Sequence, residues 1–142
     1  MEGRELTFRH KLPKTKIERY WKELENNTIL ATRCSRCGEK YYPPQADCSV
    51  CYSDDMEWVE IRGEGTLESF TQQHVIPQGF TFVSKPYTIA IARFGEYRVM
   101  GWYEGDELPK IGEKVEAYTA KDETGISKVY FRRRTLKAEE SP

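Results

Sequence analysis

The cysteines of this chain are its clearest chemical signal. They form two pairs, Cys34-x-x-Cys37 and Cys48-x-x-Cys51, which are separated by ten residues and include all four cysteines of the chain. Two residues between thiolates allow a tight turn to aim both sulfurs at one ion, and two such turns supply a tetrahedron of ligands. Zinc suits an all-sulfur cage best. We therefore predict a structural Zn²⁺ bound by Cys34, Cys37, Cys48 and Cys51.

Two disulfides or a redox iron centre are the alternatives for these thiols. The regular spacing and the lack of a signal-peptide pattern favour a reducing compartment, where disulfides are rare. Gly38 follows Cys37 as in rubredoxin-like iron sites, whereas Tyr52 follows Cys51, where a glycine would help backbone amides to reach the sulfurs. This difference favours zinc over iron, and a colourless purified protein would exclude iron.

Length and charge limit the possible classes of function. A chain of 142 residues allows one domain, or a small metal domain plus a small barrel. Lys and Arg total 22 against 23 acidic residues, and this balance disfavours a protein that coats nucleic acid, because contacts to phosphates dominate that affinity. The apolar runs are far shorter than the roughly 20 residues that span a bilayer. We expect a soluble, cytoplasmic protein.

The elements that position the cysteines begin with a helix predicted over residues 15–26. Thr15-x-x-Glu18 is a capping-box pattern, and Asn26-Asn27 can adopt the left-handed turn that ends a helix. Its apolar stripe consists of Ile17, Tyr20, Trp21 and Leu24. The stripe either packs on the chain itself or docks on a partner, since two aromatic residues on a short helix exceed what a zinc module covers.

Short strands are predicted around and after the cysteine pairs. Strands over 28–33, 40–42 and 56–61 outline a zinc ribbon, with Pro43-Pro44 in the turn between the pairs. Strands over 66–75, 87–94, 97–103, 114–120 and 126–132 follow, with a tight hairpin at Gly95-Glu96. A longer link before the fourth of these strands matches a small closed barrel of the OB type. An open sheet or an SH3-like barrel is the alternative.

The predicted fold class is therefore mainly β, with an N-terminal helix, a rubredoxin-like zinc ribbon and a five-stranded OB-fold barrel. We expect a tail and helix over residues 1–27, the ribbon over 28–62, and the OB-fold domain with a C-terminal tail over 63–142. Gly63 and Gly65 predict a flexible joint and bend between the domains. A phosphate loop is disfavoured there, because these glycines open a strand and a third glycine is missing.

Catalytic residues are not predicted. His10 and His74 are far apart in the sequence, no serine lies in a nucleophile elbow, and every cysteine belongs to a metal pair. We expect His74, at a strand end, to be exposed or structural. The sequence therefore predicts a binding protein rather than an enzyme.

Two stretches are candidates for ligand binding. Phe80, Phe82 and Val83 are apolar residues in a loop that turn chemistry would normally make polar, and such loops after the first strand often bind ligands in OB barrels. They equally suit a cap on the barrel end. The second stretch is basic, typical either of solvated surface or of phosphate binding. It comprises Lys128, Arg132, Arg133, Arg134 and Lys137, with Arg93 and Arg98 on neighbouring strands.

The order of these motifs resembles a known family. A helix with Tyr20-Trp21-x-x-Leu24 precedes the double knuckle, which is the pair of Cys-x-x-Cys turns. The segment Trp58-x-x-Ile61-x-Gly63-x-Gly65-Thr66-Leu67 follows it. Over residues 15–134 this order resembles the zinc-ribbon plus OB-fold family that is associated with acyl-CoA and is commonly labelled a domain of unknown function. The junction from the knuckles to Gly-x-Gly-Thr is the most specific part.

The resemblance implies a non-catalytic companion of thiolases and hydroxymethylglutaryl-CoA synthases that helps to bind coenzyme A, with the four cysteines as metal ligands. Aromatic side chains can stack on adenine and basic ones can pair with phosphates, so we expect acyl-CoA as the ligand. We expect an enzyme of thiolase or hydroxymethylglutaryl-CoA synthase type as the partner. The alternatives are a single-stranded nucleic-acid-binding protein, whose affinity would fall steeply with salt, and an electron carrier built on iron.

Overall fold

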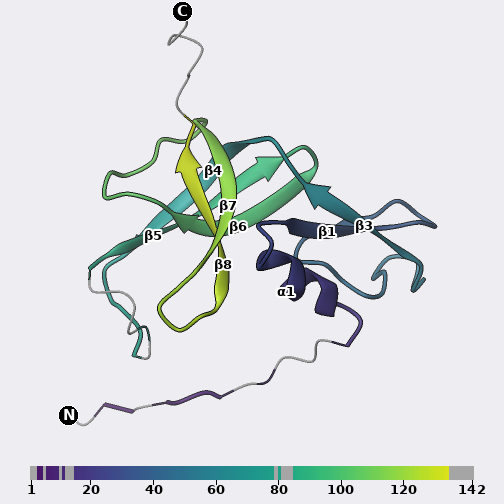
Figure 1. Ribbon diagram of the computed structural model, residues 1–142, viewed down its shortest axis with the longest axis horizontal. Helices are drawn as coiled ribbons and strands as arrows, with labels where there is room; N and C mark the ends of the chain where they lie inside the picture. Colours follow the sequence, from purple (N-terminus) through teal and green to yellow (C-terminus); the bar gives the residue numbers. More distant parts are fainter. Residues whose placement is uncertain are drawn as a thin grey trace, which may run out of the picture.

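Within the residues that it describes, the computed structural model contains one helix and eight strands (Figure 1). The described residues are 3–4, 6–9, 11, 15–78, 80 and 85–134. The elements are α1 (Glu18–Leu24), β1 (Ile29–Cys34), β2 (Lys40–Tyr41), β3 (Met56–Ile61), β4 (Glu64–Gln73), β5 (Tyr87–Phe94), β6 (Tyr97–Tyr103), β7 (Lys114–Lys121) and β8 (Ser127–Arg133). No helix in this part of the chain is long and apolar enough to cross a bilayer.

The first sheet is an antiparallel ribbon of three strands in the order β2-β1-β3. β1 pairs with β3 along its whole length, from Ile29 opposite Ile61 to Cys34 opposite Met56. β2 pairs only with the end of β1 that leads into the first cysteine pair. This short sheet therefore presents both knuckles at one end of the ribbon, as the predicted strands require.

The second sheet closes into a five-stranded barrel of order β4-β5-β6-β8-β7, in which β7 pairs back to β4. The pairs are antiparallel except for β6 and β8, which run parallel. Gly95 and Glu96 form the predicted two-residue turn, because Phe94 pairs directly with Tyr97. The predicted mainly β fold with a closed five-stranded barrel is confirmed, and an open sheet is excluded.

The helix begins three residues later than predicted, and the predicted capping box is wrong. Ile17 takes the N-cap position with φ −116° and ψ 14°, and no side chain caps the helix. Burial of Tyr20 and Leu24 fixes the helix instead, as expected where packing of an apolar face outweighs local signals. The helix ends at Leu24, two residues before the predicted end, and the predicted left-handed turn is confirmed at Asn27, which has a φ of 57°.

The two glycines at the junction between the sheets have different structural roles. Gly63, at φ 81°, makes the bend. Gly65 has a different role: it is buried within β4, and a Cβ at this position would lie 2.5 Å from Cζ of Phe94. The prediction of a flexible joint is therefore wrong for Gly65, because this glycine is needed for close packing against a core ring.

The ribbon, the helix and the barrel share one hydrophobic core. Tyr20 and Leu24 of α1 belong to the same buried cluster as Ala31 of β1 and as Val115 and Phe131 of the barrel. The apolar stripe of the helix thus packs mainly on its own chain, although Trp21 is only half-buried. In Figure 1, α1 lies beside β8, between the barrel and the ribbon strands.

Long-range hydrogen bonds connect these units. The Thr119 hydroxyl on β7 donates to the carbonyl oxygen of Leu24 over 2.6 Å, and the Tyr97 hydroxyl on β6 donates to the carbonyl of Thr32 over 3.3 Å. The Asn27 side chain also accepts from the Thr119 amide at 2.8 Å. The helix end and the ribbon are therefore fixed against the barrel by polar contacts as well as by the core.

Candidate functional site

The four cysteine sulfurs converge at the end of the ribbon. All four are free thiols, and their sulfurs lie within 4.8 Å of one another. Sulfur-to-sulfur distances are 3.5 Å for Cys34 with Cys51 and 3.5 Å for Cys37 with Cys48. A tetrahedral zinc ion with Zn–S bonds of about 2.3 Å needs sulfurs about 3.8 Å apart. The donor set therefore fits a structural zinc ion, which would order a segment too small to fold on its own apolar core.

The two knuckles have matching backbone geometry. The Gly38 amide donates to the Cys34 carbonyl at 2.9 Å, and the Tyr52 amide donates to the Cys48 carbonyl at 3.0 Å. Both residues have positive φ, 84° for Gly38 and 62° for Tyr52. Tyr52 thus adopts the conformation expected of glycine, with its side chain 87% exposed. The identity of this residue does not distinguish iron from zinc, because a tyrosine here forms the same turn.

Cys48 is prepared to act as a thiolate. Its sulfur lies 3.3 Å from the Tyr41 hydroxyl and accepts from the amides of Val50 and Cys51. The Tyr41 oxygen itself accepts from the Ser49 amide at 2.9 Å and also lies 2.9 Å from the Ser49 hydroxyl. The hydrogen bond from Tyr41, followed by those from the two amides, lowers the pKa of the Cys48 thiol to about 6. Metals bind the thiolate form, so these contacts favour coordination.

A groove of about 510 Å³ lies on the outer face of the barrel beside α1. Its floor comes from β5 and β6, where Ile89 pairs with Trp102 and Ile91 pairs with Met100. Trp21 of α1 contributes to the opposite wall. The volume lies within the range of small-molecule sites, which are largely apolar with a few polar groups.

The groove coincides with the face on which OB barrels bind ligands. That face is formed by the second and third barrel strands, here β5 and β6, together with the loops after the first and fourth strands. Phe80 lies in the first of these loops, and Ile126 follows the turn in the second. The β6–β8 ladder spans only two residues of each strand, beginning at Trp102 and Tyr130, so the groove lies where the barrel is least closed.

One end of the groove is an aromatic cluster around a lysine. The Lys128 ammonium lies 4.7 Å from the ring centroid of Trp102 and 5.8 Å from that of Phe80. Tyr87 packs on Trp102 with ring centroids 4.6 Å apart. The ammonium also pairs with the Asp122 carboxylate at 2.9 Å. This hydrogen bond from Lys128, with that from the Thr124 hydroxyl, keeps the pKa of Asp122 well below its usual range.

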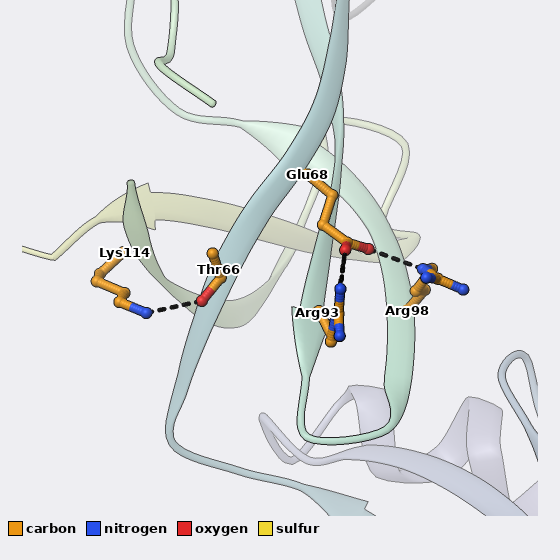
Figure 2. Close-up of polar contacts among 5 residues, drawn as sticks. All are labelled: Thr66, Glu68, Arg93, Arg98 and Lys114. Carbon is orange, nitrogen blue, oxygen red and sulfur yellow. Dashed lines mark hydrogen bonds and ion pairs between the residues drawn. The ribbon is translucent and has the colours of Figure 1, made fainter. Parts of the chain in front are cut away.

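At the other end of the groove, Arg98 shares the Glu68 carboxylate of β4 with Arg93. Figure 2 shows the Glu68 carboxylate between Arg93 and Arg98, on three neighbouring strands. Glu68 accepts from Arg98 Nε at 2.7 Å and from Arg93 Nη2 at 2.5 Å. The hydrogen bonds from Arg93 and Arg98 lower the pKa of Glu68. Arg98 lines the groove, whereas Arg93 is not among its lining residues.

The rest of the predicted basic run lies away from the groove. Arg132 pairs with Glu116 at 3.3 Å and Arg133 pairs with Glu113 at 2.9 Å. Neither arginine lines the groove. The structure thus brings Arg98 and Lys128 to the groove and leaves Arg93, Arg132 and Arg133 outside its lining. Phe80 is not a lining residue either, but its ring lies near Lys128 and Trp102 at one end of the groove. Phe82, Val83, Lys137 and His10 lie outside the described residues, and His74 is exposed after β4, as predicted.

Sequence reasoning missed the floor of the groove. The signal was present in β5, where Tyr87, Ile89 and Ile91 alternate with the inward Thr88, Ala90 and Ala92. A barrel strand with one face toward solvent normally alternates apolar with polar residues. An apolar outward row therefore marks a surface that another molecule or element covers.

Comparison with known families agrees with this architecture. Residues 21–57 match the rubredoxin-like zinc ribbon domain of ChsH2, and residues 58–120 match the C-terminal OB-fold domain of ChsH2. A DUF35 domain-containing scaffold protein of Methanocaldococcus jannaschii is 29% identical over 82 residues, which cover 56% of this chain and 57% of that protein. One from Pyrococcus furiosus is 29% identical over 118 residues, covering 78% and 85%. The chain thus spans little more than half the length of the first relative.

Two solved structures share the fold. The Ltp2-ChsH2(DUF35) aldolase matches with a TM-score of 0.74 and 22% identity, covering 88% of this chain and 98% of that one. A DUF35-family protein of Sulfolobus solfataricus, described as of unknown function, matches with a TM-score of 0.58 and 24% identity, covering 82% and 84%. The resemblance drawn from the sequence is confirmed. The chain belongs to the family that joins a ChsH2-type rubredoxin-like zinc ribbon to a ChsH2-type OB-fold domain.

Proposed function

We propose that this chain is a non-catalytic scaffold that binds acyl-CoA jointly with an enzyme of thiolase or hydroxymethylglutaryl-CoA synthase type. The observation that carries this proposal is the apolar groove on the ligand-binding face of the barrel, between β5–β6 and Trp21 of α1. Such a groove suits the long, mostly apolar part of an acyl thioester. The names of the relatives support the scaffold role, since two of them are called scaffold proteins.

The chemistry of the groove favours binding over catalysis. Arg98 and Lys128 are the charged side chains that line it, and each is paired with a carboxylate. The described histidine and the four cysteines lie elsewhere. Tyr20 and Tyr42 also line the groove, but their hydroxyls hydrogen-bond each other and burial raises the pKa of Tyr42. Acid–base or nucleophilic catalysis needs a titratable or nucleophilic group beside the reacting atoms. We therefore assign the reaction itself to the partner, which is consistent with the enzyme named with ChsH2 in the similar structure.

The proposal is tested by isolating the native complex and measuring its ligand binding. We expect a thiolase-class enzyme to copurify with the chain from its native cell. Calorimetry with acetyl-CoA on the chain alone and on the complex should detect binding in at least one of the two. Heat in neither titration would overturn the proposal. An oligonucleotide that shifts the chain at low salt would instead favour nucleic-acid binding.

A further inference from the structure

The basic side chains around the groove have acidic neighbours, although Glu68 offsets only one of the two arginine charges that it contacts. Arg93 and Arg98 share Glu68, and Lys128 pairs with Asp122. The pairs farther out are Arg132 with Glu116, Arg133 with Glu113, and Lys40 with Glu96. Each of these carboxylates offsets part of the attraction that its cation would otherwise exert on a phosphate group.

The two carboxylates at the ends of the groove are held in place. The Asp122 side chain is 2% exposed and also accepts from the amides of Thr124 and Ile126. The Glu68 side chain is 25% exposed and accepts from two arginines. The lowered pKa of each shows that the ionised form is stabilised where it lies. An incoming phosphate would therefore meet fixed negative charge beside each cation, which disfavours its binding.

The space between these ends suits an uncharged chain. From Arg98 to Trp102 the groove follows four residue steps of β6, which is about 13 Å at roughly 3.3 Å per residue. Met100 and Ile91 lie side by side midway, and Trp21 contributes to the facing wall. The β6–β8 ladder begins only at Trp102, so the β6 residues before Trp102 are not paired with β8.

We propose that the groove between Trp21 and the β5–β6 floor binds the uncharged part of the thioester, the acyl group and pantetheine arm, while the nucleotide phosphates are bound by the partner enzyme. This inference rests on the proposed acyl-CoA function and assigns to this chain one half of the ligand. It also gives a reason for joint binding, since neither protein alone would contact the whole molecule.

The test uses the zinc-loaded full chain and three probes: hexanoyl-CoA, hexanoyl-pantetheine and 3′-phospho-ADP. Binding is followed by the fluorescence of Trp21 and Trp102, which line the groove, and by calorimetry. We expect the two thioesters to bind with Kd values within about threefold of each other at both 50 and 500 mM salt, because no phosphate contact is made. We expect 3′-phospho-ADP not to compete. Hexanoyl-CoA binding about tenfold tighter than hexanoyl-pantetheine, or competition by 3′-phospho-ADP, would show that this chain contacts the nucleotide phosphates. Either result would overturn the inference.

A matched pair of variants locates the site. Met100 is 60% exposed in the groove floor, and Ile111 is 61% exposed and does not line the groove. Both should tolerate glutamate, which circular dichroism and zinc content would verify. We expect Met100→Glu to weaken both thioesters by at least about tenfold and Ile111→Glu to change neither. Equal thioester binding by both variants would overturn the assignment of the binding site to the groove.

Two further outcomes separate the failure of this inference from the failure of the proposed function. If the chain alone binds neither thioester but the complex with its enzyme does, the inference fails and the scaffold function stands. If neither sample binds, the proposed ligand is wrong. Loss of enzyme docking by Met100→Glu, with thioester binding intact, would instead identify the groove as a protein contact and overturn the inference.

Discussion

Replacing Gly65 by alanine is expected to destabilise the barrel, although alanine is normally the better-tolerated residue. A Cβ at this position would lie 2.5 Å from Cζ of Phe94 and within 2.8 Å of both Cε atoms. Phe94 is 5% exposed, and its ring stacks on Phe131 with centroids 6.0 Å apart. The ring therefore cannot move aside without disturbing the buried cluster.

Two opposing effects set the size of the change. Alanine restricts the unfolded chain and contributes about 0.4–1 kcal/mol of stability. Overpacking a close-packed core costs about 1–3 kcal/mol. The net expectation is a loss of about 1–2 kcal/mol in the free energy of unfolding, which corresponds to about 2–8 °C in Tm for a chain of this size.

A double-mutant cycle identifies the cause. Gly65→Ala, Phe94→Leu and the double variant would be unfolded by urea at a fixed excess of zinc, because bound metal shifts apparent stability. Leucine leaves room for the new methyl group, so the double variant should be more stable than the sum of the single effects by about 1 kcal/mol. Additive effects, or a Gly65→Ala variant as stable as the parent, would refute the packing argument.

Three other perturbations follow from the contacts described. Removing the metal with a strong chelator should disorder the ribbon and lower the Tm of the whole chain, because the ribbon and barrel share a core. Native mass spectrometry would measure the bound metal, and circular dichroism would measure the Tm. A metal-free chain with an unchanged Tm would contradict the zinc assignment. Thr119→Val removes the 2.6 Å hydrogen bond to the Leu24 carbonyl, which keeps only a 3.4 Å bond from the Asn27 amide. The change should cost about 1 kcal/mol in urea unfolding, whereas Thr71→Val on the exposed side of β4 should cost little. Burial and the hydrogen bond to Glu113 raise the pKa of Tyr103 to about 12. The unfolded chain ionises first, so the stability that this phenol contributes below its ordinary pKa of about 10 should be lost as pH rises toward 12. Tyr103→Phe should therefore show a shallower fall in the urea midpoint over this range, and equal slopes would count against the raised pKa.

Local patterns in the sequence were sufficient to predict the fold. The Cys-x-x-Cys spacing is sufficient to predict a metal site, because two turns with this spacing can bring four sulfurs together with little dependence on the surrounding residues. Strand and turn residues placed β5 and β6 without error, and Gly95-Glu96 marked their hairpin. The start of α1 was misplaced because its position depends on burial of Tyr20 and Leu24, which no capping pattern records.

The site was less predictable because it depends on register between distant segments. Arg98, Lys128 and Phe80 were among the ligand contacts predicted from residue type and position along the strands and loops. The structure places Arg98 and Lys128 in the lining of one groove, with the Phe80 ring near Lys128. Their acidic partners were not foreseen. Glu68 reaches Arg98 across 30 residues of sequence, beside a register shift between Leu67 and Ser69 in β4. A slip of one residue would move that carboxylate to the opposite face of the sheet.

The shared core and the composite groove have a consequence for the evolution and engineering of this architecture. Tyr42 comes from the ribbon, Trp21 from the helix and Met100 from the barrel, yet all three border the same cavity. The modules therefore cannot be shuffled independently. A chimera that exchanges only the metal-binding half with a distant relative should still chelate zinc, but its groove would acquire one foreign wall and a different shape.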